Sequence, residues 1–322
     1  MRSSGNLGDD TIRCRVCGHG DAEPLGQIPD CGEFAGQQVS PSIKGGWLWC
    51  CRDCGSMFRY PTLSSTDYIS LYEKAPSTVW VEGGTDRNDF VTIYTYLKNH
   101  HGGSILDVGC YVGDFLAGLP DRFKGYGIEP SDLASKSAAS KGIEVLGKTL
   151  DELDSDKVFD VVVSIDVVEH VLDVEKFLGQ SLVHVKENGL LIISTGNPGC
   201  FFWRKIFKSR FWYNSYPEHL VFPSFKYFCE FAKRHDLPLP EQICFKYVDI
   251  HFRASFFGFL RQIVFAISPV MHRAFISLRR SMKGIAIPMA ANIPLGTPGV
   301  FTDHQAVIFR KRGQQWNLAE KV

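Results

Sequence analysis

The sequence predicts an α/β protein built around a mostly parallel sheet, with a small cysteine-rich part before it. From residue 104 onward, short apolar runs alternate with segments of helical length. The runs Ser104–Val108 and Phe159–Ile165 are nearly continuous in aliphatic residues, which is typical of strands buried on both faces of a parallel sheet. Gly109 and Gly113 follow the first run, where they allow a tight turn and the close approach of a ligand.

The individual elements follow from local patterns. A helix is expected over Thr85–His101, because apolar or aromatic residues recur there at helical spacing. The expected strands are Ser104–Val108, Phe123–Ile128, Ile143–Leu146, Phe159–Ile165, Leu190–Ser194, Gln242–Ile250 and Gln305–Arg310. The other expected helices start at Gly113 or span Ser131–Ser140, Asp173–Lys186 and Ser224–His235. These elements make seven strands, the last two late and paired.

Composition changes divide the chain. We expect a flexible tail at 1–10, a zinc-binding module at 11–61, a connector at 62–84, an α/β domain at 85–313 and a second tail at 314–322. Within the α/β domain, residues 251–300 are expected to form a helical insertion before the last strand. Tyr68 and Tyr72 are expected to anchor the connector.

Charge and apolar runs exclude several classes of protein. Lys plus Arg and Asp plus Glu number 35 each, so no overall field attracts nucleic acid. Residues 200–285 nevertheless carry 14 basic and 5 acidic side chains, which indicates a local anionic partner. The first residues lack the apolar run of a secretory signal, and no stretch has the length of a membrane span. We therefore expect a cytoplasmic protein.

The glycine turn indicates a cofactor without phosphate. Asp107 precedes the turn, and Glu129, 22 positions later, ends the next strand, where it can accept hydrogen bonds from a ribose diol. A carboxylate at Asp107 would repel a pyrophosphate, but it suits a ligand that carries an ammonium and a sulfonium. S-adenosylmethionine is such a ligand.

Residues 105–115 resemble motif I of class I methyltransferases, commonly Asp-x-Gly-x-Gly-x-Gly, with Tyr111 where the middle glycine usually stands. The resemblance implies a Rossmann-like seven-stranded methyltransferase sheet that binds S-adenosylmethionine. The cofactor-binding residues implied in this way are Asp107, Gly109, Cys110, Gly113, Glu129, Pro130, Thr149, Leu150 and Asp166.

Six of the ten cysteines lie within the first 54 residues. Cys14 and Cys17, and then Cys51 and Cys54, form two Cys-x-x-Cys pairs, each followed by a glycine. Without an export signal, this pattern favours a structural, zinc-ribbon-like Zn²⁺ site over disulfides. Cys31 or Cys50 could replace one of the four ligands.

Arg59-Tyr60-Pro61 follows the second cysteine pair, and Asp67, Tyr68 and Tyr72 come next. This arrangement resembles bacterial methyltransferases with an N-terminal zinc-binding module, which include sugar C-methyltransferases acting on nucleotide-linked deoxysugars. The resemblance covers roughly residues 12–235 and the final strand. It implies a small-molecule acceptor, most plausibly a sugar or nucleotide-sugar in polysaccharide or natural-product biosynthesis.

Two clusters could remove the proton of an acceptor. His170 and Glu169 follow the strand that ends near Asp166, at the edge where open α/β sheets bind ligands. Tyr216, Glu218 and His219 resemble the Tyr-x-Glu-His motif of the sugar C-methyltransferases, whose side chains lie at the substrate. We expect His219, Glu218, Tyr216 and His170 to be the catalytic residues. Each histidine could instead cap the helix that follows it.

The segment 201–213 combines cations with aromatic rings. It could hold a diphosphate, or it could contact an anionic membrane near a lipid-linked sugar together with residues 255–280. It could also be a helical lid with a buried aromatic face.

Two other functions compete with small-molecule methyl transfer. The zinc module could grip RNA, although the neutral net charge and the lack of Asn/Asp-Pro-Pro-Tyr after the fourth strand count against an RNA methyltransferase. The chain could also be a non-catalytic binding module of the same fold. The sequence leaves C- against O-methylation and the oligomeric state open.

Overall fold

A computed structural model describes residues 12–34, 37–74, 87–247 and 302–313. The predicted tails at 1–10 and 314–322, the predicted insertion at 251–300 and the end of the predicted connector lie outside the described residues. Among the residues that are described, no helix is both long and apolar enough to cross a bilayer.

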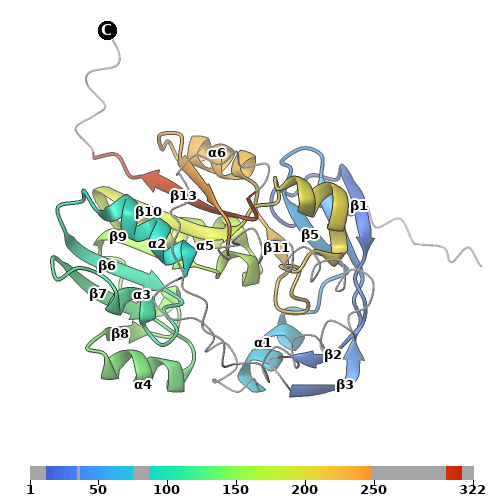
Figure 1. Ribbon diagram of the computed structural model, residues 1–322, viewed down its shortest axis with the longest axis horizontal. Helices are drawn as coiled ribbons and strands as arrows, with labels where there is room; N and C mark the ends of the chain where they lie inside the picture. The colour runs from blue at the N-terminus through green and yellow to red at the C-terminus, as the bar shows by residue number, and fades with distance from the viewer. Residues whose placement is uncertain (1–11, 35–36, 75–86, 248–301, 314–322) are drawn as a thin grey trace, which may run out of the picture.

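The main sheet has the predicted seven strands, in the order β12-β13-β10-β9-β6-β7-β8 (Figure 1). Strands β6 to β10 run parallel, and β13 runs antiparallel between β10 and β12. The strands are β6 Gly103–Val108, β7 Phe123–Ile128, β8 Glu144–Gly147, β9 Phe159–Ile165, β10 Val185–Gly196, β12 Glu241–Phe245 and β13 His304–Arg310. The carboxyl ends of β6, β7 and β9 therefore meet the beginning of β13 at one edge of the sheet.

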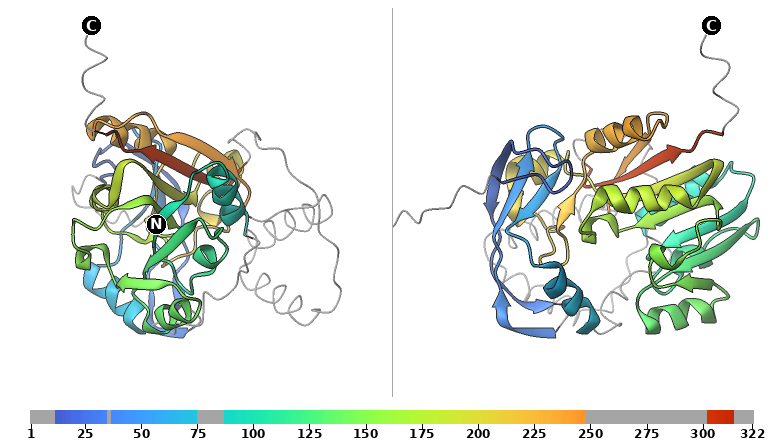
Figure 2. Two further views of the ribbon diagram at one scale, coloured as in Figure 1. Left: turned by 90° about the vertical axis from the view of Figure 1, so that its left-hand side faces the viewer. Right: turned by 180° about the vertical axis from the view of Figure 1, so that it is seen from behind.

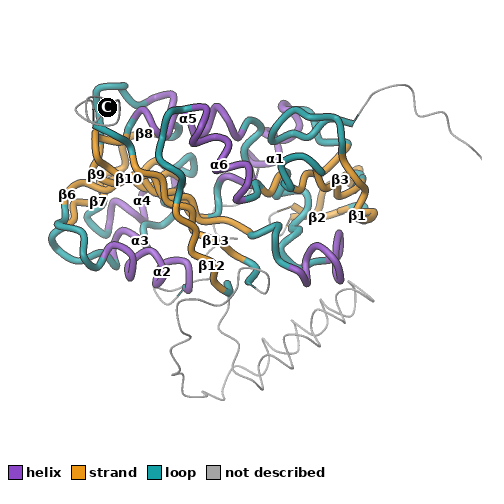
Figure 3. Tube along the Cα trace, turned by 90° about the horizontal axis from the view of Figure 1, so that it is seen from above, coloured by secondary structure: helices purple, strands orange, loops and turns teal. Residues whose placement is uncertain are grey.

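Helices cover both faces of this sheet, as Figure 3 shows from above. On one face α2 and α3 pack against aliphatic side chains such as Ile105 and Val161. On the other face α5 and α6 pack against Leu106 and Val162. The helices are α2 Asn88–Leu97, α3 Asp114–Ala117, α4 Asp132–Ser140, α5 Val174–Val183 and α6 Phe225–Arg234. Because the central strands are buried on both faces, the sequence shows unbroken aliphatic runs there.

Helix starts agree with the sequence because their caps are local. Ser131, Asp173 and Ser224 each accept a hydrogen bond from a backbone N–H in the first turn of the helix that follows. Strand β10 is longer than predicted: it starts at Val185, and an irregularity in its pairing with β9 spans the polar residues before Leu190. Apolar periodicity alone could not show this extension.

The larger sheet of the cysteine-rich part includes a strand from the α/β part. Its strands β1, β4 and β5 are completed by β11 of the α/β part, in the order β1-β4-β5-β11. The bounds are β1 Ala22–Gln27, β4 Trp47–Cys51, β5 Met57–Tyr60 and β11 Val221–Phe222, with a separate hairpin of β2 Cys31–Phe34 and β3 Gln37–Ile43, and helix α1 Ser65–Lys74. Figure 2 shows this sheet beside the larger one. Residues on both sides of the predicted boundary thus share one structure.

Candidate functional site

Asp107 is a buried carboxylate that lacks a full set of partners. It lies at the end of β6, is 3% exposed, and its Oδ1 has no hydrogen-bond partner among the described residues. Burial raises its pKa to about 8, and nearby Glu129 adds to this effect more than Arg87 opposes it. A carboxylate with an unfilled oxygen at this edge of the sheet fits a ligand that brings a cationic N–H donor.

The glycine turn that follows has the backbone that the motif requires. Gly109 and Gly113 have φ of 82° and 78°, and a Cβ on Gly109 would lie 2.5 Å from Val167 Cγ2. Tyr111 also adopts a left-handed conformation, with φ of 49°, so the turn is kept although a glycine is missing. Cys110 is buried, with its sulfur next to the backbone of Gly127, so only its backbone can face a cofactor.

Glu129 is held in place by backbone donors. Its Oε2 accepts from the N–H of Tyr111 at 2.9 Å, and its Oε1 accepts from the N–H of Ser131 at 2.8 Å. Burial raises its pKa, and the two backbone bonds oppose that effect. The carboxylate keeps free lone pairs for two neighbouring hydroxyls. Of the other predicted cofactor residues, Pro130 and Thr149 are exposed and Leu150 is buried. Glu129 N donates to Gly147 O, which brings the segment that contains Thr149 and Leu150 close to Glu129.

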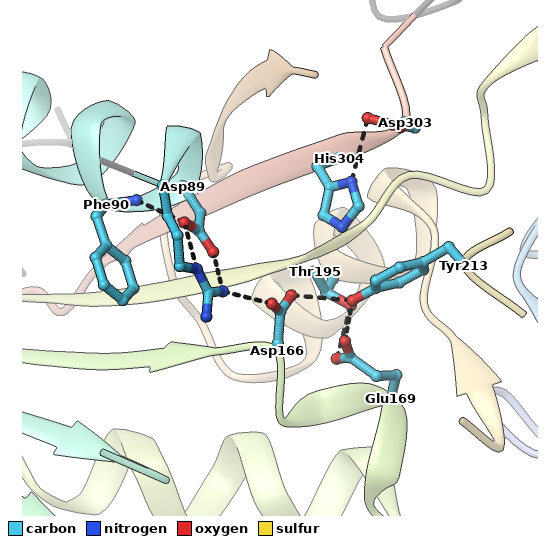
Figure 4. Close-up of polar contacts among 9 residues, drawn as sticks. Asp89, Phe90, Asp166, Glu169, Thr195, Tyr213, Asp303 and His304 are labelled. Carbon is cyan, nitrogen blue, oxygen red and sulfur yellow. Dashed lines mark hydrogen bonds and ion pairs between the residues drawn. The ribbon is translucent and has the colours of Figure 1, made fainter. Parts of the chain in front are cut away.

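Asp166 lies at the end of β9 within a charged network that the sequence did not reveal (Figure 4). Arg87 Nη2 donates to Asp166 Oδ2 at 2.6 Å, and it also pairs with Asp89, which is fully buried. Burial lowers the pKa of Arg87, but the two carboxylates outweigh this and raise it. Arg87 immediately precedes α2 and belongs to no recognisable sequence motif, so the sequence offered no sign of its role.

Glu169 lies one turn beyond Asp166, in the interior. It is 0% exposed, its Oε2 accepts from Thr195 Oγ1 at 2.9 Å, and its Oε1 is bonded to the Tyr213 hydroxyl. Tyr213 also donates to Asp166 Oδ1 at 3.0 Å. Burial and the charge of Asp166 raise the pKa of Glu169 to about 7. Tyr213 was noticed in the sequence only as part of an aromatic segment.

The two predicted histidines meet at this edge. The rings of His170 and His219 are 4.7 Å apart, edge to face. His170 Nδ1 bonds to Glu218 O at 3.0 Å, and His219 Nδ1 bonds to Tyr213 O at 2.7 Å. Because carbonyls only accept, each Nδ1 carries the proton and each Nε2 presents a lone pair. Burial lowers both pKa values, that of His170 to about 4, so both rings are neutral.

Tyr216 and Glu218 lie on the same loop as His219, but the Tyr216 ring points elsewhere. The Arg59 guanidinium stacks 3.4 Å from the Tyr216 ring, and the Tyr216 hydroxyl donates to Lys44 O at 2.7 Å. Tyr68, an expected connector anchor, donates to the backbone carbonyl of Glu218 at 2.6 Å. These contacts tie the loop to the cysteine-rich part. The structure thus brings His219 and His170 together and does not bring Tyr216 with them.

A second pair of residues at the edge, Asp303 and His304, was missed. His304 begins β13, is fully buried, and its Nδ1 lies 3.2 Å from Asp303 Oδ1. Its ring packs edge to face on Tyr213, with ring centres 4.4 Å apart. Burial lowers the pKa of His304, but Asp303, Asp166 and Glu169 outweigh it and raise the value. Only the antiparallel direction of β13 brings this residue to the carboxyl edge.

The four predicted zinc ligands converge. Their sulfurs lie within 4.8 Å of one another, with 3.8 Å between Cys14 and Cys54 and 3.6 Å between Cys17 and Cys51. Zn–S bonds of about 2.3 Å at tetrahedral angles require sulfurs about 3.8 Å apart. Cys50 bonds to backbone carbonyls instead, and Cys31 donates to Glu33 O. The donor set therefore fits one Zn²⁺.

Glu169, His170 and His219 also place ligand-type atoms within 4.8 Å of one another. Glu169 is fully buried, and both of its oxygens are already engaged in hydrogen bonds with Thr195 and Tyr213. We therefore assign no metal to this group.

The aromatic basic segment packs mainly inward. Trp203 is fully buried against Phe211, Tyr213 and Phe222. The outer surface of the segment carries three exposed apolar side chains. These are Phe201, Phe202 and Ile206, which are 42%, 38% and 55% exposed. The segment thus combines the expected buried aromatic face with an exposed apolar strip.

Comparisons with known proteins concern the α/β part of the chain. Residues 88–240 match the family model described as "Methyltransferase domain". The ubiquinone biosynthesis O-methyltransferase of Rickettsia conorii is 39% identical over 102 residues, which cover 29% of this chain and 35% of that protein. The protein of the same name from Bradyrhizobium sp. is 38% identical and covered to 40%. The chain thus spans well under half the length of these curated relatives.

A solved structure supports the fold. Phosphoethanolamine N-methyltransferase 2 of Haemonchus contortus, in complex with S-adenosyl-L-methionine, aligns over 80% of this chain and 62% of its own, with a TM-score of 0.50 and 15% identity. The α/β part therefore has the fold of the class I methyltransferases, and residues 88–240 match a methyltransferase family model.

Proposed function

We propose that this chain, which carries a methyltransferase domain, transfers the methyl group of S-adenosylmethionine to a small-molecule acceptor. The observation that carries the proposal is the pair of carboxylates at the glycine turn. Asp107 is buried with an unfilled oxygen, and Glu129 is held by two backbone N–H groups. In this proposal Asp107 accepts from the methionine ammonium and Glu129 from the ribose hydroxyls.

The cofactor, when bound, supplies the methyl group and the leaving group. The residues of the chain then need only align the acceptor and take its proton. His170, His219 and Asp166 are partly exposed polar side chains at this edge, so the acceptor is expected to meet them. Neutral histidines, whose Nε2 atoms carry a lone pair, are suited to accept a hydrogen bond from a hydroxyl and to orient it.

Calorimetry with S-adenosylmethionine tests the cofactor site. Asp107→Ala and Glu129→Ala should each weaken binding, the former by about 100-fold or more, because loss of one partner of a buried charge pair costs about 3–5 kcal/mol. His219→Gln should leave the affinity unchanged and reduce turnover. Failure of the unmodified chain to bind S-adenosylmethionine would favour a non-catalytic binding module.

We propose a hydroxyl oxygen as the acceptor atom, first of a sugar or nucleotide-linked sugar. The sugar class rests on the motif at 216–219 and on the cysteine pairs, whereas the O-atom follows the names of the curated relatives. Tyr216 contacts Arg59 and Lys44, so its position lends no support to polarisation of a keto sugar. A panel should compare a nucleotide-linked deoxysugar, a catechol such as 3,4-dihydroxybenzoate and an RNA by release of S-adenosylhomocysteine. Methylation of RNA alone would replace this proposal.

We also propose that Cys14, Cys17, Cys51 and Cys54 hold one structural Zn²⁺. The inter-sulfur distances near 3.7 Å support this, because they match a tetrahedral thiolate site. Measurement of one zinc per chain, lost on Cys51→Ser, would agree with it.

We further propose that the strip of Phe201, Phe202 and Ile206, beside Arg204 and Lys205, contacts an anionic membrane that carries a lipid-linked acceptor. Exposed apolar groups next to cations support the proposal. Sedimentation with vesicles of phosphatidylglycerol should retain the chain, and Ile206→Glu should release it. Equal recovery with neutral vesicles would contradict it.

A further inference from the structure

A chain of hydrogen bonds leads from the ligand edge into the interior. It runs from Arg87 to Asp166, then through the Tyr213 hydroxyl to Glu169, and ends at Thr195 (Figure 4). Exposure falls along it, from 20% at the Asp166 side chain to 4% at Tyr213 and 0% at Glu169. Only its first carboxylate is therefore accessible to an acceptor.

Counting hydrogens shows that this chain of hydrogen bonds holds one proton more than it would if both of its carboxylates were ionised. The Tyr213 hydroxyl has a single hydrogen, yet its oxygen lies within hydrogen-bond distance of both Asp166 and Glu169. Thr195 already spends its hydrogen on the other oxygen of Glu169. One carboxyl must supply the missing hydrogen, because two carboxylates facing one hydroxyl would leave an unsatisfied and repulsive contact. Glu169, the more deeply buried of the two, is the natural carrier.

Asp166 also has an unusual backbone conformation, in the bend just after β9. Its φ is 53°, in the left-handed region, where a residue with a side chain costs about 1 kcal/mol or more. This conformation aims its carboxylate at Tyr213 and Arg87 rather than along the sheet. Backbone strain of this kind persists where the surrounding structure fixes the residue, and such residues cluster at functional sites.

His304 lies beside the same chain. Its Nε2 has no hydrogen-bond partner among the described residues although the ring is fully buried. Figure 4 shows the ring reaching from β13 toward the Tyr213 hydroxyl, with Asp303 behind it. His304 Nε2 is therefore a further atom that can hold a proton next to this chain of hydrogen bonds.

We infer that Asp166 is the base of the methyl-transfer reaction, and that the proton already held between Tyr213 and Glu169 leaves Asp166 ionised, so that Asp166 itself takes the proton of the acceptor. The inference rests on the proposed function. As the acceptor oxygen bonds to the methyl carbon, the S–CH3 bond breaks and its electron pair stays on the sulfur. The O–H of the acceptor becomes strongly acidic at that moment, so a carboxylate suffices to take the proton. Asp166 gives up this proton after the methylated product has dissociated.

The histidines then orient the acceptor and do not remove its proton. Burial lowers the pKa values of His170 and His219, which makes both weak bases. The charged and titratable groups that face the chain come from several elements: Arg87, Asp89, Asp107, His170, His219, Tyr247, Asp303 and His304.

Infrared spectroscopy tests the shared proton without an acceptor. The spectrum should be taken at neutral pH with S-adenosylhomocysteine bound, because Asp107, with its raised pKa, would otherwise add a protonated carboxyl of its own. We expect a carboxylic-acid carbonyl band that disappears in Glu169→Gln and shifts in Tyr213→Phe. Asp160→Asn is the control, since Lys186 and Ser104 hold the pKa of that carboxyl at about 2 despite partial burial. A Glu169→Gln spectrum identical to that of the unmodified chain would overturn the inference.

The second test measures turnover of the acceptor that the comparison of candidate substrates identifies. Asp166→Asn should lower kcat by about 100-fold to 10,000-fold, the usual contribution of a general base. His184→Gln is the matched histidine control: His184 is buried, caps α5 and bonds to Lys157 O, so its loss should leave kcat unchanged. A chain that fails to bind S-adenosylmethionine would refute the proposed function itself, whereas one that binds it and keeps its kcat in Asp166→Asn would refute only the role of Asp166.

Discussion

Replacement of Asp107 by asparagine should stabilise the chain without cofactor and weaken its binding of S-adenosylmethionine. The carboxylate is 3% exposed, and its Oδ1 has no partner among the described residues. Without a cationic ligand, its negative charge is therefore uncompensated at the end of β6. Asparagine has nearly the same shape but no charge to desolvate. The two effects of Asp107→Asn have opposite signs, which separates a binding role from a structural one.

The pKa of Asp107 sets the size of the expected change in the free energy of unfolding. Burial and Glu129 raise it from 3.8 to about 8. At about 1.4 kcal/mol for each pH unit, full ionisation in the folded state costs about 6 kcal/mol above pH 8, and holding the proton at pH 7 costs about 4 kcal/mol. A gain of half these values in Asp107→Asn would already raise Tm by several degrees in a chain of this size.

The pH dependence follows from the same values. The folded state binds the Asp107 proton more tightly than the unfolded state does, so the stability due to this group is full below about pH 4 and is lost as pH rises through about 8. The advantage of Asp107→Asn should therefore grow between these two pH values and then level off.

Urea unfolding from pH 5 to 9 measures this difference, and calorimetry measures the affinity for S-adenosylmethionine. Asp160→Asn is the control with the opposite sign, because Lys186 and Ser104 stabilise that carboxylate and lower its pKa to about 2, so the variant should be less stable at neutral pH. An Asp107→Asn variant that is less stable than the unmodified chain at pH 8, or that keeps its affinity for the cofactor, would refute the reasoning.

Three further predictions concern other parts of the site. Removal of zinc by a chelator, or Cys51→Ser, should lower Tm and also turnover, because β5 pairs with β11 only two residues after His219; an unchanged Tm in metal-free protein would contradict it. Tyr111→Gly should change the free energy of unfolding by less than about 1 kcal/mol and leave cofactor affinity within a few-fold in calorimetry, since the left-handed backbone suits glycine. Arg87→Ala should cost about 3–5 kcal/mol in urea unfolding, because Asp89 is fully buried and loses its partner; a loss below 1 kcal/mol would show that Asp89 is neutral.

The strands, the helix starts and the glycine turn could be predicted because their signals are local. Aliphatic runs, the caps Ser131 and Asp173, and the pair of Asp107 and Glu129 each lie within a few residues of the turn or strand that they define. The acceptor side was predicted less well. Tyr216 was expected beside His219, yet its ring stacks on Arg59, which is far away in the chain.

The sequence by itself determined the α/β class, the glycine turn and the four convergent cysteines, because backbone preferences and metal-ligand spacing act over short stretches. Only the tertiary structure decided that the cysteine-rich strands share a sheet with β11 and that Arg87, Tyr213 and His304 surround Asp166 and Glu169. These contacts join segments that are distant in the chain. They depend on the direction of β13 and on the pairing of β5, and no local pattern encodes either.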